Sequence, residues 1–69
     1  MPLTLAVIGE ENIIKRIGGS AEVRAHLQNL GFVSGAVVTV VSSMAGKLIV
    51  RVKDARIAVS KEMASKIMI

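Results

Sequence analysis

The sequence predicts an all-β fold: a small antiparallel barrel of five short strands, with one short helix between the first and second strands. The length of 69 residues and the hydrophobic fraction of 52% fit one domain, residues 1–69, with a core of its own. Most apolar residues fall in short β-branched or alternating runs. The connections between these runs are short, which favours antiparallel pairing, and five short strands can remove their open edges by curling into a barrel.

The N-terminal quarter is expected to be extended. Residues 3–9 begin as extended chain, and residues 13–19 have the composition of the first strand. The apolar period of this strand is imperfect, because Ile14 and Ile17 both point inward only if the strand holds one extra residue. We therefore predict a β-bulge at residues 15–16.

The clearest local signals mark a helix that begins after Ser20. Its hydroxyl can accept a hydrogen bond from an early backbone N–H. Val23, Leu27 and Leu30 recur at helical spacing and form one apolar stripe, which is expected to cover an open end of the barrel. Gly31 then follows, and it can adopt the left-handed conformation that ends a helix.

The second half of the chain is expected to be almost entirely β. Residues 36–41 are nearly all β-branched, and residues 47–53 alternate between apolar and other side chains. The predicted segments are strand 36–41, loop 42–46, strand 47–53, turn 54–55, strand 56–59, a helical turn at 61–64 capped by Ser60, and strand 66–69.

The sequence carries no pattern of catalytic groups. It has one His, no Cys and five acidic residues. No nucleophile–base pattern, phosphate-binding loop or metal-ligand spacing occurs, so we expect no enzymatic activity, no catalytic residue, no cofactor and no metal site. His26 lies at the edge of the helical stripe, where a lone histidine is more often a packing or surface residue than a ligand.

The formal net charge of +4 raises the question of an anionic partner. Among the basic residues, only Arg51, Lys53 and Arg56 are expected to gather, on adjacent strands. Phe32 is the sole aromatic residue, so a base-stacking platform is absent and no nucleic-acid partner is expected. A solvated basic face is the simplest interpretation; attraction to an acidic protein surface or to an anionic membrane face remains open.

The expected location is the cytoplasm. The N-terminal segment lacks the basic and apolar regions of a secretory signal, and no apolar run reaches the ~18–20 residues of a membrane span. We expect contact with a membrane only through a partner. An unpaired edge strand leaves a homo-oligomer open.

The central segment reads Arg24-x-x-Leu27-x-x-Leu30-Gly31-x-x-x-Gly35. This pattern resembles the central signature of FeoA proteins, the small cytoplasmic components of bacterial ferrous iron uptake. The resemblance extends to Leu5–Gly9, to Ile14 with Ile17, to the valine run after Gly35, to the hairpin that ends at Val59 and to Ala64-x-x-Ile67. Ser34 departs from the proline common in the family, which predicts a slightly looser turn, and Asp54 replaces a common glycine.

The resemblance implies an SH3-like β-barrel and a non-enzymatic accessory role. The implied partner is FeoB, the membrane ferrous iron transporter with a cytosolic GTP-binding domain. Two alternatives stay open: a regulatory SH3-like domain related to those of metal-dependent transcription repressors, and a transition-metal-binding module. The residues predicted to contact the partner are Arg24, His26, Gln28, Phe32 and Met44.

Overall fold

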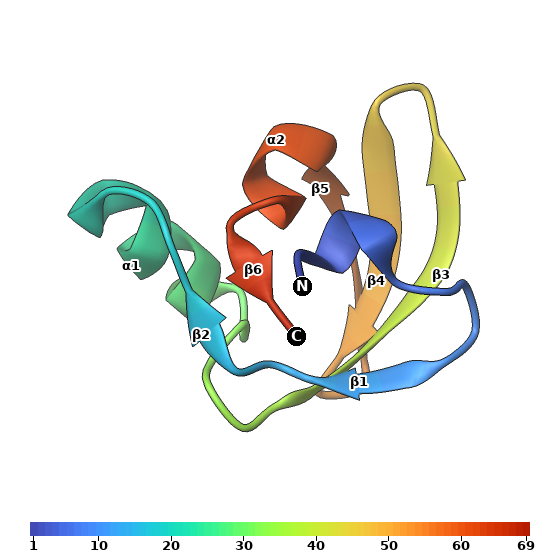
Figure 1. Ribbon diagram of the computed structural model, residues 1–69, viewed down its shortest axis with the longest axis horizontal. Helices are drawn as coiled ribbons and strands as arrows, with labels where there is room; N and C mark the ends of the chain where they lie inside the picture. The colour runs from blue at the N-terminus through green and yellow to red at the C-terminus, as the bar shows by residue number, and fades with distance from the viewer.

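The chain forms two antiparallel sheets, with one main helix beyond them at one end of the molecule (Figure 1). A computed structural model describes residues 1–69. In chain order the elements are the 3-10 helix η1 (Leu3–Leu5), β1 (Glu11–Ile13), β2 (Arg16–Ile17), α1 (Ala21–Asn29), β3 (Val37–Met44), β4 (Lys47–Val52), β5 (Ala55–Ser60), α2 (Lys61–Ala64) and β6 (Ile67–Met68). The predicted mostly β class, the antiparallel pairing and the single main helix are confirmed.

The larger sheet has the strand order β1-β3-β4-β5, and the smaller one pairs β2 with β6. The strands therefore number six and form two sheets, where the sequence predicted five strands. The chain ends lie side by side in the middle of the molecule, as Figure 1 shows. The Ile69 N–H donates to the Met1 carbonyl at 2.7 Å, and Pro2 bridges to Met68.

The predicted first strand at residues 13–19 is in fact divided between the two sheets. The Ile14 N–H donates to Ala36, next to β3, at 2.9 Å, whereas the Lys15 N–H donates to Met68 of β6 at 2.7 Å. The bulge predicted at residues 15–16 is thus wrong: the chain leaves one sheet and enters the other at that point.

The N-terminal segment also differs from the prediction. Residues 3–9 were expected to be extended, but Leu3–Leu5 form η1. The Leu3 side chain is fully buried, so tertiary packing decides the conformation of this segment. The last strand, predicted at 66–69, is limited to Ile67–Met68.

Helix α1 confirms its predicted signals. The Val23 N–H donates to the Ser20 hydroxyl at 3.2 Å. Gly31 follows the helix with φ of 106°, and the Phe32 N–H donates back to the Leu27 carbonyl at 3.0 Å. This closing bond belongs to the Schellman motif, and it turns Phe32 under the helix. Figure 1 shows α1 at the end of the molecule beside β2.

Both hairpins of the larger sheet turn through two residues. The loop predicted at 42–46 is wrong, because β3 runs to Met44 and only Ala45 and Gly46 form the turn. The next turn holds Lys53 and Asp54, one residue earlier than predicted. All four turn residues have positive φ, the combination that type I′ turns require. The register of β3 shifts between Val40 and Ser42, which places a bulge in that strand.

The core holds thirteen buried side chains, all apolar. They are Leu3, Ile14, Leu27, Phe32, Val38, Val40, Leu48, Val50, Val52, Val59, Ala64, Ile67 and Ile69. They come from both sheets, from α1 and α2 and from both ends of the chain. The Met63 N–H donates to the Ser60 hydroxyl at 3.1 Å, which confirms the predicted cap of α2. No helix of the structure has the length and apolar character needed to cross a bilayer.

Candidate interaction surfaces

Three of the predicted contact residues lie on α1 and are exposed: Arg24, His26 and Gln28. Arg24 and Gln28 are one helical turn apart, so they are neighbours on the same face. His26 is two residues from each and points to another side of the helix. The exposed surface of α1 therefore offers a guanidinium beside an amide, with the imidazole apart from both.

The other two predicted contact residues do not join this surface. Phe32 has no exposed area and is the largest fully buried side chain. Its prediction as a surface contact conflicts with this position, because the Schellman bond turns it into the core. Met44 is 63% exposed, but it ends β3 at the hairpin tip, on the far side of the molecule from α1 (Figure 1). The five residues thus do not form one continuous site.

No group of three or more His, Cys, Asp or Glu side chains is placed to hold a metal ion. His26 is the only histidine in the chain, and it is exposed on α1. Structural and catalytic zinc sites use three or four converging protein ligands. One exposed imidazole in one copy of the chain does not supply them.

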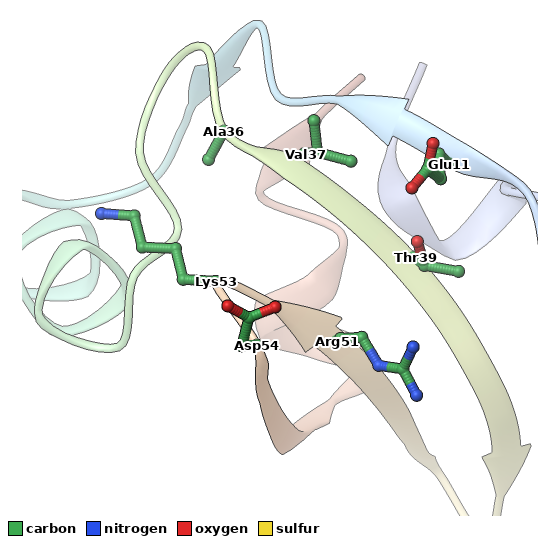
Figure 2. Close-up of a pocket in the computed structure, with 7 residues that line it drawn as sticks. All are labelled: Glu11, Ala36, Val37, Thr39, Arg51, Lys53 and Asp54. Atoms are coloured by element: carbon green, nitrogen blue, oxygen red, sulfur yellow. The ribbon is translucent and has the colours of Figure 1, made fainter.

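A shallow hollow lies on the outer face of the larger sheet, opposite the core. It has a volume of about 310 Å³ and is lined by Glu11, Ala36, Val37, Thr39, Arg51, Lys53 and Asp54. These residues come from β1, β3 and β4 and from the segments that adjoin them (Figure 2). The pairing of the strands explains the grouping, because Glu11 pairs with Thr39 and Thr39 pairs with Arg51.

The rim of this hollow carries charges of both signs. Figure 2 shows Lys53 and Arg51 pointing to opposite sides, with the Asp54 carboxylate between them and Glu11 across the hollow. Ala36 and Val37 supply apolar surface. The lining has no His and no Cys. Such a hollow is suited to binding a polar or charged group of a partner.

The predicted gathering of Arg51, Lys53 and Arg56 is confirmed only for the two arginines, because the Lys53 side chain points away from Arg51 (Figure 2). Arg51 pairs directly with Arg56 across β4 and β5, and Lys53 follows in the turn that joins them. Like charges placed directly opposite each other destabilise a sheet. We call Arg51 and Arg56 the basic cluster.

Sequence reasoning missed an exposed apolar surface near the N-terminus. Leu5, Val7 and Ile8 are each more than half exposed, and exposed Ile13 pairs with exposed Val37. The only signal for this surface is the run of apolar residues from Leu3 to Ile8, which a strand prediction assigns to the core. The hollow was missed for a related reason, since its lining depends on the pairing of β1 with β3.

The family match, a curated relative and a solved structure all point to the same protein family. The FeoA domain family matches residues 1–69. A protein of Methanocaldococcus jannaschii named Fe(2+) transport protein A is 32% identical over 68 residues, which are 99% of this chain and 83% of that protein. A crystal structure of an iron uptake regulatory protein (FeoA) is 29% identical with a TM-score of 0.89, covering 97% of this chain and 91% of that one.

Two more distant structures share the fold. FeoA of Stenotrophomonas maltophilia, complexed with zinc and described as an SH3 domain protein, is 22% identical with a TM-score of 0.86, covering 99% of this chain and 87% of that one. A manganese-dependent transcriptional repressor is 17% identical with a TM-score of 0.88, covering 97% of this chain but 39% of the repressor. At these identities the likeness concerns the fold alone, which is SH3-like.

Proposed function

The chain belongs to the FeoA family, and from that premise we propose that it is a non-enzymatic accessory of ferrous iron uptake. It acts by contact with the cytosolic part of the membrane transporter FeoB, and it works in the cytoplasm. The observation that carries the proposal is the family match over the whole chain, together with a relative named for Fe(2+) transport.

The contact surface that we propose includes the exposed face of α1. Arg24 and Gln28 are neighbours there and can both donate hydrogen bonds to a partner, and His26 extends the surface around the helix. Arg is enriched in interfaces because its planar group makes several directed hydrogen bonds. Phe32 is left out because it is buried, and Met44 would need a second, separate contact.

A pull-down with the FeoB cytosolic domain, with and without guanine nucleotide, tests the proposal. The expected result is binding that weakens when Arg24→Ala and Gln28→Ala are combined. Lys47→Ala is the matched control, since Lys47 is an exposed cation on β4, outside α1. Absence of binding at ~100 μM in both nucleotide states would contradict the proposal, because a working contact is expected to be tighter.

The manganese-dependent repressor does not favour a regulatory function for this chain, since its likeness is one of fold.

A further inference from the structure

Strand β5 has one edge without a partner. In the order β1-β3-β4-β5 it pairs with β4 alone, along all six of its residues. The two-residue turn makes Val52 and Ala55 the first bonded pair, so every second residue from Ala55 onward bonds to β4. Arg56 and Ala58 lie between these positions. Their backbone N–H and C=O groups therefore point away from the sheet.

No other part of the molecule uses these groups. The hydrogen bonds made outside regular helices and strands do not include the backbone of Arg56 or of Ala58, and both residues are exposed. The opposite edge of the sheet, β1, has only three residues. The open edge of a six-residue strand, with unpaired N–H and C=O groups at alternate residues, is a template for an extended chain.

The two faces beside this edge differ in chemistry. On the outer face Arg56 stands at the edge, with Arg51 directly behind it on β4, while Lys53 and Asp54 of the adjoining turn have opposite charges. On the inner face Ile57 is half-buried and packs against the core. An added strand would place alternate side chains beside Arg56 and the remaining ones over Ile57.

We infer that the β5 edge binds an extended acidic segment of a partner protein as an additional strand. The segment carries Asp or Glu on the outer face, beside the basic cluster, and apolar side chains over Ile57. This inference rests on one part of the proposed function, namely that the chain acts through contact with another protein. A second copy of the chain suits the edge less well, because each copy has a net charge of +4 and would bring a second basic cluster.

Titration of the isotope-labelled chain with a short synthetic peptide of alternating Glu and Val residues tests the inference by NMR. The Arg56 and Ala58 amide hydrogens should gain protection from solvent exchange when the peptide binds. The Ile57 amide is the internal control, since it bonds to β4 in either state. A peptide with Lys in place of Glu should bind about tenfold more weakly or not at all.

Two variants separate the charge from the backbone contribution. Arg56→Glu reverses the charge beside the guest strand and should weaken binding about tenfold, whereas Arg16→Glu makes the same change at an exposed position on β2 of the smaller sheet and should not. Ala58→Pro removes an edge N–H that β4 does not use, so the fold should survive while peptide binding is lost. If Ala58→Pro does not fold, the backbone contribution is tested on the peptide instead. A peptide N-methylated at the amides that face β5 should not bind, whereas a control peptide N-methylated at the amides that face away from β5 should bind.

Equal binding of the acidic and basic peptides would overturn the inference, as would full binding by Arg56→Glu or no binding at ~1 mM peptide. Light scattering that shows self-association abolished by Ala58→Pro would also overturn it, since a second copy would then be the occupant. The titration uses this chain alone. It can fail while the FeoB pull-down succeeds, or succeed while the pull-down fails.

Discussion

Replacing Phe32 by alanine should destabilise the protein strongly. Phe32 has no exposed area and is the largest fully buried side chain. Burial of a phenylalanine removes about 150–250 Å² from water, worth about 4–6 kcal/mol at ~25 cal/mol per Å². Alanine keeps part of this contribution, so the expected loss in the free energy of unfolding is about 3–5 kcal/mol.

A loss of this size approaches the whole stability of the fold. A chain of this length is expected to have a free energy of unfolding of roughly 3–10 kcal/mol. The melting temperature should fall by roughly 12–40 °C. If the parent lies in the lower part of that stability range, the Ala variant is expected to be unfolded at physiological temperature. Phe32→Leu keeps most of the volume and should lose about 1–2 kcal/mol.

Urea unfolding followed by far-UV circular dichroism is the appropriate assay, because the chain has no Trp and no Tyr for fluorescence. Ile13→Ala is the matched control: its side chain is 60% exposed and should lose less than about 1 kcal/mol. A Phe32→Ala variant as stable as Ile13→Ala would refute the core position. If Phe32→Leu lost FeoB binding at unchanged stability, Phe32 would be a contact residue after all.

Three further predictions concern local features. Ser20→Ala removes the cap of α1 and should lower the free energy of unfolding by about 1 kcal/mol in the same assay; an unchanged value would mean that the bond from the Val23 N–H is not formed in solution. Asp54→Gly should raise stability by about 0.5–1 kcal/mol, because Asp54 has φ of 64° and glycine adopts this conformation without strain; a loss of stability would contradict the turn. His26→Ala should leave zinc affinity unchanged in a calorimetric titration, since no ligand group converges on it, and a clear drop would reveal a site shared between molecules.

Helix α1 could be predicted from sequence because its signals are local. Ser20 and Gly31 act on backbone groups a few residues away, and the structure has both in their predicted roles. The two hairpin turns were harder to place for the opposite reason. Ala45 and Lys53 adopt positive φ without being glycine or asparagine, so composition gives no sign that the turn begins there.

The errors in the first third of the chain come from non-local contacts. The irregular period around Ile14 was a true signal, but a bulge and a change of sheet produce the same pattern along the chain. Only the bonds of Ile14 toward β3 and of Lys15 to β6 distinguish the two. Ser34 adds a hydrogen bond that a proline at this position could not make, since its hydroxyl donates to the Lys15 carbonyl at 2.9 Å. The prediction of Phe32 as a contact residue has a similar cause. Phe32 follows a helix, and only the Schellman bond decides that its side chain is buried.

The position of the β4–β5 turn decides which basic side chains face each other. A turn at residues 54–55 would pair Lys53 with Arg56, whereas the observed turn pairs Arg51 with Arg56. Both turns keep the same residues on the outer face, because moving the turn by one residue shifts the pairing by two. Alternation alone therefore predicts a basic outer face, and only the register sets two guanidinium groups opposite each other.

The direct pairing of Arg51 with Arg56 affects both the stability of the fold and the binding of an acidic strand at β5. Two arginines in direct cross-strand pairing weaken the sheet, and Arg56→Glu converts them to an opposite-charge pair, which should raise the free energy of unfolding by about 0.5–1 kcal/mol. The same change should weaken binding of an acidic strand at β5. A variant that is more stable and yet binds less cannot be explained by unfolding, so the two measurements together would assign Arg56 to the contact. A variant that is less stable than the parent would show that the guanidinium groups already have partners within the fold.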